Sequence, residues 1–400
     1  MSVKEDVARI IEECFETAKE AVKNNSRAEY FKELRNKYKY ICIFGMGSLG
    51  GEMLRMMGRF GVPVDFVCDN NYESVKATYK GEAKLITFDE LCKYKDECLV
   101  FVSPSNGVRK INDAINGQLN DAGFKNVVRG PLWKNMAYMI QEIVEIDKDD
   151  FLKNIMTMLD YAEDAESKEL IRDYVEVLLK DYRDIDADNI IEKWFEPKHY
   201  FPDFLKPRKD ECFVDGGAFC GDTFVTYNDW TNGEYEKYYG FELEDVNRSR
   251  LEAQIKKVEK DADKYRVYPY GLYDKYEKVE IVAQNDGSHI SDTVEANNEE
   301  CLFAEVNALD ECLKGKKVTF IKMDIENSEI PAIHGAEHII KEQKPLCAIS
   351  MYHGLKQFME IPILLKKLNP DYRIRYRVHS SVGHDVVCYA VDKNDVEHLR

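Results

Sequence analysis

The stretch Val-Asp-Gly-Gly-Ala-Phe-Cys-Gly-Asp-Thr at residues 214–223 decides the fold of the C-terminal half of the chain. Apolar residues lead into it as a strand, its glycines predict a tight turn, and the residues after it open a helix. This order is typical of a parallel α/β sheet, in which ligands bind at the carboxyl ends of the strands. The sequence therefore predicts a ligand site at this turn.

The charges at the turn indicate which ligand it binds. Asp215 and Asp222 place carboxylates where a dinucleotide needs room for its pyrophosphate. S-adenosylmethionine carries a sulfonium and an ammonium group, which the same carboxylates attract, and the helix N-terminus can receive its carboxylate. The run Tyr239-Gly240-Phe241-Glu242 predicts a second strand whose terminal acid, Glu242, can accept hydrogen bonds from ribose hydroxyls.

A third buried strand, at residues 320–323, ends in Asp324 and Glu326 on the same rim. These acids could orient an acceptor, hold a divalent cation or cap the next helix, and the sequence leaves the metal requirement unknown. His353 follows the apolar run Leu-Cys-Ala-Ile-Ser-Met-Tyr; its ordinary pKa suits a base, and the alternative is a histidine bonded to the neighbouring sheet. His289, expected on an exposed polar loop, is a minor candidate.

The region from about Trp194 to the end resembles the FkbM-type methyltransferase family. The resemblance lies in VDGGAFCGDT, YGFELED, VNALDECL, IKMDIENSEIPAIHGA and the tail that begins SMYHGLKQF. It implies a class I methyltransferase fold, a seven-stranded sheet with the last strand antiparallel. It also implies O-methylation of a sugar, glycan or other small hydroxylated metabolite; polyketide acceptors and N-methylation remain open. Asn327 stands where the family has glycine, although asparagine also tolerates left-handed backbone angles.

The predicted site therefore has two parts. The predicted catalytic residues are His353, Asp324 and Glu326. The predicted cofactor-binding residues are Asp215, Gly216, Gly217, Ala218, Phe219, Gly221, Asp222, Thr223, Phe241, Glu242, Leu243, Gly271, Leu272 and Asp324.

The N-terminal half carries a second glycine loop, of the dinucleotide type. Gly45, Gly47, Ser48 and Gly50 follow an apolar strand, and Asp69 closes the next strand, where a ribose-binding acid belongs. This loop has no acid inside it, so it could accept the phosphates of a nucleotide, a nucleotide sugar or NAD. The alternatives are a domain that serves only in binding or assembly, and a bifunctional enzyme that uses this loop for NAD.

Strands alternate with helices in both halves, which predicts two Rossmann-like parallel-sheet domains joined by a helical connector. We expect an amphipathic helix in residues 1–37, a Rossmann-like nucleotide-binding domain in 38–131, the connector in 132–205 and the methyltransferase domain in 206–400. The expected inward positions of the connector are Ile140, Ile143, Phe151, Ile155, Met158 and Leu159.

Composition limits the partners. The 400 residues carry a formal charge of −18, which opposes binding to nucleic acid or to an anionic membrane surface. The first residues do not form a signal peptide, so we expect a cytoplasmic location. The eleven cysteines are expected to be reduced, the acceptor to be a small hydroxylated molecule, and a homo-oligomer stays open.

Overall fold

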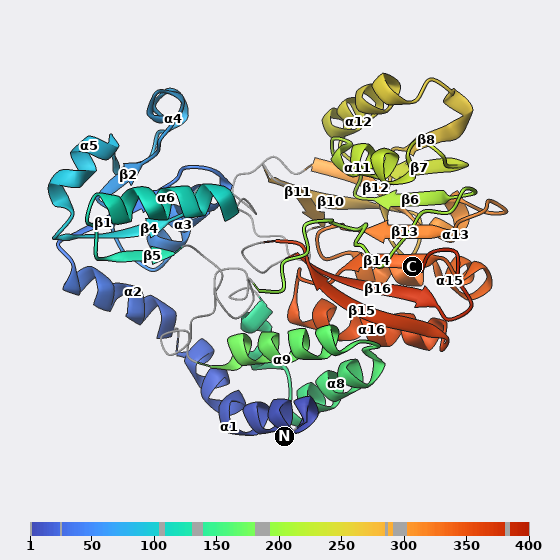
Figure 1. The fold of residues 1–400 in the computed structure, drawn as a ribbon, viewed down its shortest axis with the longest axis horizontal. Helices are drawn as coiled ribbons and strands as arrows, with labels where there is room; N and C mark the ends of the chain where they lie inside the picture. The colour runs from blue at the N-terminus through green and yellow to red at the C-terminus, as the bar shows by residue number, and fades with distance from the viewer. Residues whose placement is uncertain are drawn as a thin grey trace.

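The computed structural model describes residues 2–24, 26–103, 109–129, 139–180, 193–284, 287–290, 302–380 and 385–399. It contains a five-stranded sheet in the N-terminal region and a seven-stranded sheet in the C-terminal region, each with helices packed against it (Figure 1). The predicted α/β fold class, with two sheet domains, is confirmed.

The five-stranded sheet is parallel throughout and has the order β3-β2-β1-β4-β5. Its strands are β1 (Tyr40–Phe44), β2 (Phe66–Cys68), β3 (Lys84–Ile86), β4 (Cys98–Val102) and β5 (Val127–Arg129). The connecting helices are α3 (Ser48–Arg59), α4 (Tyr72–Thr78), α5 (Phe88–Leu91) with the 3₁₀ turn η1 (Cys92–Tyr94), and α6 (Arg109–Asp121). The central strands β1 and β4 are buried along almost their whole length, as the continuous apolar runs of a parallel sheet predict.

The seven-stranded sheet has the order β15-β16-β14-β13-β6-β7-β8. Its strands are β6 (Cys212–Gly216), β7 (Lys237–Phe241), β8 (Tyr265–Tyr268), β13 (Phe320–Met323), β14 (Leu346–Ser350), β15 (Tyr372–Val378) and β16 (Val386–Asp392). The last strand, β16, runs antiparallel to both of its neighbours, as predicted. The helices are α11 (Asp222–Thr231), α12 (Asp245–Val258), α13 (Leu309–Cys312), α14 (Glu329–His334), α15 (Glu337–Gln343) and α16 (Leu355–Leu368), with the 3₁₀ turn η3 (Ala262–Lys264).

A separate four-stranded sheet, of order β11-β10-β12-β9, was not predicted. It consists of β9 (Gly271–Leu272), β10 (Glu277–Gln284), β11 (Gly287–Ile290) and β12 (Leu302–Asn307). Two expectations are corrected here. The run Lys-Val-Glu-Ile-Val-Ala-Gln belongs to this sheet and not to the main one, and His289 lies on a strand paired with β10, not in a loop. Charged and apolar residues alternate in β10, which suits an antiparallel sheet with one solvated face. This explains why β10 is not a strand of the buried seven-stranded sheet.

Residues 1–37 form two helices and not one. Helix α1 (Val3–Lys23) buries Val7, Ile10, Ile11, Phe15 and Ala18 against the 3₁₀ turn η2 (Glu142–Glu145) and the helices α8 (Lys148–Tyr161) and α9 (Ala165–Leu179). Helix α2 (Ser26–Lys37) instead adds Phe31 to the core of the first sheet. A single amphipathic pattern cannot show that its two halves pack against different partners.

The connector shares its core with the C-terminal sheet. All of its predicted inward positions are buried, and they form one apolar cluster with α16 and β15. The Tyr174 ring stacks on Phe358 with centroids 5.5 Å apart, and the Arg377 guanidinium donates to the Asp164 carboxylate at 2.7 Å. In Figure 1, α1, α8 and α9 lie together beneath β15 and α16. The helices therefore form part of the body that carries the second sheet.

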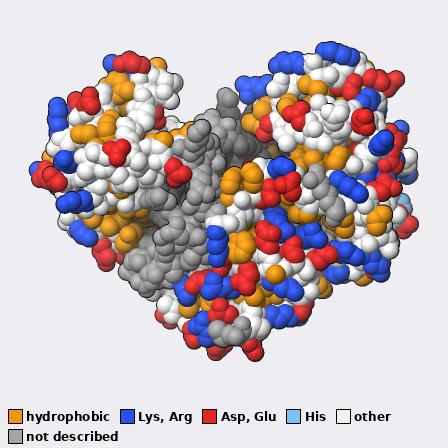
Figure 2. Space-filling view, in the orientation of Figure 1, with side chains coloured by type: hydrophobic (Ala, Val, Ile, Leu, Met, Phe, Trp, Pro, Cys, Tyr) orange, Lys and Arg blue, Asp and Glu red, His pale blue; other side chains and the backbone are white. Residues whose placement is uncertain are grey.

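The next features are the charges on the surface and the state of the cysteines. On the face in Figure 2, acidic and basic side chains are interspersed over the C-terminal body. The ten cysteines that the structure describes are free thiols. Among the described residues, none of the helices combines the length and the apolar character that a membrane crossing requires.

Candidate active site

The loop between β6 and α11 lies across the ends of three strands. The backbone N–H groups of Gly217 and Ala218 both donate to the carbonyl of Phe241, at 3.1 and 3.0 Å, which ties the loop to the end of β7. Gly217 has φ +72°, and a Cβ there would lie 2.0 Å from the carbonyl oxygen of Asp324. Only glycine fits this position, so the loop is pressed directly against the end of β13.

Asp215 is engaged in internal contacts. Its carboxylate is fully buried, 3.0 Å from the Nζ of Lys322 and 2.8 Å from the hydroxyl of Tyr238. Lys322 also donates to the carbonyls of Gly216 and Gly217, at 3.0 and 2.8 Å. Burial opposes its charge, but Asp215 and Asp324 raise the pKa of Lys322 above its usual value. This carboxylate is therefore already part of an internal ion pair, and the predicted attraction between Asp215 and a cofactor stays a prediction.

Glu242 is the acid that faces the loop. One of its oxygens accepts from the backbone N–H of Phe219 at 2.9 Å and the other accepts from the N–H of Glu244 at 2.8 Å. Only 7% of the residue is exposed, and burial raises the pKa of Glu242 to about 7. The carboxylate therefore lies between the glycine loop and the start of α12, where a ligand of the loop would meet it.

The other predicted cofactor residues surround the same loop. Phe241 stacks on Tyr268 with ring centroids 4.6 Å apart, and Leu272 packs beneath Gly216. Gly271 lies against the Leu243 side chain, and α11 begins with Asp222 and Thr223 after Gly221, which has φ +90°. The structure thus brings the predicted set together at the carboxyl ends of β6, β7 and β13. Their contact with a cofactor stays a prediction.

An acidic cluster lies on the other side of Gly217. Asp324 accepts hydrogen bonds from the hydroxyls of Tyr200, at 2.7 Å, and Tyr352, at 3.2 Å. Burial opposes its ionisation, but the cations His353 and Lys322 outweigh burial and hold the pKa of Asp324 at about 2. This carboxylate is therefore ionised at any physiological pH.

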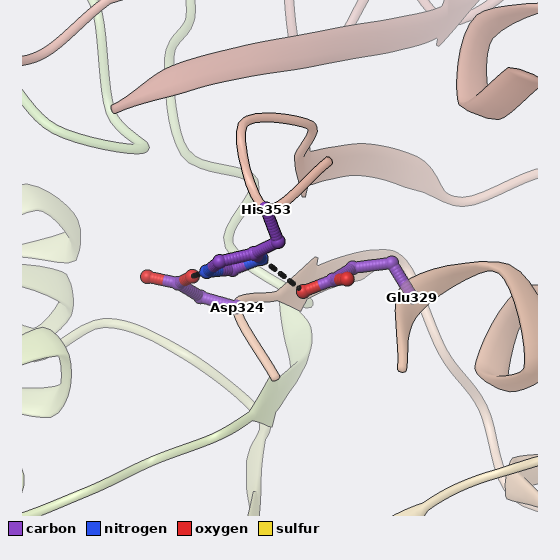
Figure 3. Close-up of side chains that lie close together, drawn as sticks. All are labelled: Asp324, Glu329 and His353. Atoms are coloured by element: carbon purple, nitrogen blue, oxygen red, sulfur yellow. Dashed lines mark ion pairs between the residues drawn. The ribbon is translucent and has the colours of Figure 1, made fainter. Parts of the chain in front are cut away.

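His353 lies between carboxylates, as Figure 3 shows. Its Nδ1 is 2.9 Å from Glu329 Oε1, and its Nε2 is 3.5 Å from Asp324 Oδ1 and 3.6 Å from Glu326 Oε2. Burial lowers its pKa, but these three acids, Glu329 foremost, raise the pKa of His353 to about 10. The expectation that His353 acts as a base with an ordinary pKa is therefore corrected: in this arrangement the imidazole already carries its second proton at neutral pH.

The turn after Asp324 has an unusual backbone. Glu326 and Asn327 have φ +51° and +75°, so asparagine does take the left-handed conformation that the family glycine would supply. Gln357 holds the turn by donating to the Asn327 carbonyl and side-chain oxygens, at 2.8 and 3.0 Å. Left-handed non-glycine residues cluster at functional sites, and here the turn directs Glu326 towards His353.

The N-terminal glycine loop is also closed by internal contacts. Gly45 has φ +101°, and a Cβ at Gly50 would lie 2.0 Å from its carbonyl oxygen. Asp69, the expected ribose acid, accepts from the backbone N–H groups of Met46 and Asn71, both at 2.7 Å. Gly47 caps α3, and the Ser48 side chain lies outside the described part of the structure. Nucleotide binding at this loop stays a prediction.

Sequence reasoning missed Lys322, Glu329 and the two tyrosines. Lys322 has a signal in the sequence, because a lysine inside the apolar run Phe-Ile-Lys-Met requires a buried partner. Tyr200 comes from the irregular, proline-rich segment before β6, and no local pattern links it to Asp324. Glu329 looks like an ordinary first-turn acid of α14.

The strand order, with β16 inserted antiparallel beside β14, and the glycine loop after β6 define a class I methyltransferase fold. Residues 215–374 match the model of the methyltransferase FkbM domain. The C-terminal half therefore carries an FkbM-type domain, and the chain is a methyltransferase of the S-adenosylmethionine-dependent kind.

Among solved structures, the chain resembles methyltransferase FkbM from Methylobacillus flagellatus KT, with 18% identity and a TM-score of 0.64 over 95% of this chain and 99% of that one. Two further solved structures match with TM-scores of 0.30 each. A putative rRNA methylase from Clostridium thermocellum has 8% identity over 52% of this chain and 93% of its own. Fibrillarin from Aeropyrum pernix, solved with bound S-adenosyl-L-methionine, has 10% identity over 46% of this chain and 68% of its own. No curated protein matches.

Proposed function

We propose that this chain transfers a methyl group from S-adenosylmethionine to a hydroxyl of a sugar, a glycan or another small hydroxylated metabolite. One observation carries the proposal: Gly217 of the glycine loop abuts Asp324 of the acidic cluster. A cofactor on the loop and an acceptor at the cluster would therefore be neighbours, and alignment of the two reactants is the main requirement of a displacement reaction.

The residues around the loop fit this cofactor. Gly217 and Gly221, with φ +72° and +90°, take the backbone angles that fold the loop tightly between β6 and α11. Glu242 can exchange its bonds to backbone N–H groups for bonds to ribose hydroxyls. Lys322 is fully engaged with Asp215 and two carbonyls, so it does not offer a cation to a phosphate. When bound, S-adenosylmethionine supplies an electrophilic methyl group.

Glu326 is the best placed group to receive the acceptor proton. Its side chain is 44% exposed, more than Asp324 at 23% or His353 at 8%. Burial raises the pKa of Glu326 above its usual value, which makes it a stronger base than an ordinary carboxylate. As the methyl group moved from the sulfur of the bound cofactor to the acceptor oxygen, with the bonding electrons left on sulfur, Glu326 would accept the hydroxyl proton.

Asp324 and His353 then act by orientation. Asp324 is fixed by two tyrosine hydroxyls, and an ionised carboxylate in a fixed position can accept a hydrogen bond from a second hydroxyl of the acceptor. The imidazolium of His353 offsets part of the negative charge that three neighbouring acids would otherwise concentrate.

The test is a transfer assay with methyl-labelled S-adenosylmethionine and a panel of sugars, nucleotide sugars, small alcohols and amines. We expect the label in a base-stable methyl ether, and a loss of roughly a hundredfold in rate for Glu326→Gln. Asp229→Asn, an exposed acid on α11, serves as the matched control and should keep full activity. Label that enters amines alone would contradict the proposed O-methylation.

A further inference from the structure

Both ring nitrogens of His353 are buried, and neither makes a hydrogen bond of regular geometry to the described residues. Nδ1 lies 2.9 Å from Glu329 Oε1, whereas no carboxylate oxygen of the described residues lies that close to Nε2. Nε2 faces Asp324 Oδ1 at 3.5 Å and Glu326 Oε2 at 3.6 Å. Both distances exceed the usual 2.7–3.2 Å of a hydrogen bond. They are close to the separation of roughly 3.0–3.4 Å between two ligand atoms that bind one cation at about 2.1 Å each.

Glu329 fixes the direction of this nitrogen. It is fully buried at the start of α14, and its Oε1 accepts from the backbone N–H of Ile325 at 2.9 Å while lying 2.9 Å from His353 Nδ1. Figure 3 shows the imidazole between Glu329 on one side and Asp324 on the other. A histidine that binds a metal usually has its second nitrogen held by a carboxylate in this way.

The groups around His353 carry the negative charge that a cation requires, and hydrogen bonds hold the Asp324 carboxylate in place. Three carboxylates surround one histidine, so the cluster keeps an excess of negative charge even when the imidazole is protonated. Asp324, Glu329 and His353 each offer an atom within 4.8 Å of the others. The hydroxyls of Tyr200 and Tyr352 orient the Asp324 carboxylate from outside, as partners of ligating carboxylates do.

We propose that Asp324, Glu326 and His353 Nε2 bind a divalent transition-metal cation, which takes the place of the proton on Nε2 and releases that proton to solvent, with Glu329 as the positioning residue for the imidazole. A mixed set of one imidazole and two carboxylates suits Mn²⁺, Fe²⁺, Co²⁺ or Zn²⁺ better than Ca²⁺. Three protein ligands leave positions open for two oxygens of an acceptor. The cation binding stands on the geometry alone; its use for the acceptor rests on the proposed function.

The role for the acceptor follows from the chemistry of such a site. A cation that binds the acceptor oxygen fixes it beside the cofactor loop and lowers the pKa of the hydroxyl. Glu326 Oε1, the oxygen that does not face His353, remains available for the proton. Vicinal hydroxyls could bind together, which favours sugars and other diols over simple alcohols as acceptors.

The experiment titrates Mn²⁺ into the full chain after treatment with a chelator and dialysis, without cofactor or acceptor, and follows the signal of free Mn²⁺ by electron paramagnetic resonance. We expect saturable binding of one Mn²⁺ per chain. Glu326→Gln should weaken it more than tenfold, and Glu329→Gln by roughly ten- to a hundredfold. His334→Gln, at an exposed histidine of α14 that pairs with Glu337 of α15, should leave it unchanged.

Circular dichroism of Glu326→Gln separates loss of binding from loss of fold, because this side chain is half-exposed and its replacement is isosteric. Absence of saturable binding, or binding that Glu326→Gln leaves unchanged, would overturn the cation site. This outcome can be told apart from a failure of the proposed function. Methyl transfer that persists in the presence of a chelator would overturn the role of the cation in the reaction but would leave the proposed methyltransferase activity standing.

Discussion

The buried pair of Asp215 and Lys322 allows a sharp test of how the cofactor loop is built. The two side chains are 0% and 2% exposed, and their charged atoms lie 3.0 Å apart. Asp215→Asn keeps an acceptor for the Tyr238 hydroxyl but removes the charge that neutralises Lys322. Leaving one buried charge without its partner costs about 3–5 kcal/mol, which corresponds to a fall of about 6–20 °C in melting temperature at roughly 2–4 °C per kcal/mol.

The assay is thermal unfolding of the full chain, together with calorimetric titration of S-adenosylmethionine. Lys322→Met should destabilise the protein to a similar degree, and the combination of Asp215→Asn with Lys322→Met should recover much of the loss because neither buried charge remains. The reasoning would be refuted by an Asp215→Asn protein that melts like the parent but no longer binds the cofactor. That result would show that the carboxylate serves the ligand directly.

Three further predictions concern the loop, the ribose acid and the C-terminus. Gly217→Ala should abolish cofactor binding in calorimetry, because the added Cβ would lie 2.0 Å from the carbonyl oxygen of Asp324. Gly233→Ala, also at φ +72° but with only the Asn228 side chain near its Cβ, at an ordinary 3.8 Å, should cost only about 1 kcal/mol in unfolding. Glu242→Gln should weaken S-adenosylmethionine binding roughly tenfold to a hundredfold; unchanged affinity would exclude it as the ribose ligand. His398, fully buried between Asp395 and Glu211, has its pKa raised from 6.5 to about 9, since hydrogen bonds to these acids outweigh burial. Its contribution of about 3 kcal/mol is present below pH 6.5 and lost as pH rises through 9, and urea unfolding of His398→Gln should lack this loss.

Much of the fold could be predicted because the strands that matter are continuous apolar runs next to glycine turns. β6 and its loop, β7 with Glu242, and β13 with Asp324 all lie where the sequence places them. The sheet of β9 to β12 was not predicted. β10 alternates charged and apolar residues, and its position is set by antiparallel pairing with β12, which lies much later in the sequence. Pairing of this kind depends on contacts far apart in the sequence.

The chemistry of the site was less predictable than its position. The notion of His353 as a base assumed an ordinary pKa, but that value depends on Glu329 and on burial, neither of which follows from the local sequence. The ion pair of Asp215 was missed for a similar reason, since its partner Lys322 comes from another strand. In both cases the neighbour that decides the charge of the residue comes from elsewhere in the fold.

The most direct test of the account is a crystal structure of the chain with S-adenosylmethionine or its demethylated product. We predict the ribose at Glu242, the backbone of the ligand along Gly217–Gly221, and its sulfur directed towards Asp324 and Glu326. A ligand found instead at Gly45–Gly50 of the first sheet, with the second loop empty, would contradict it.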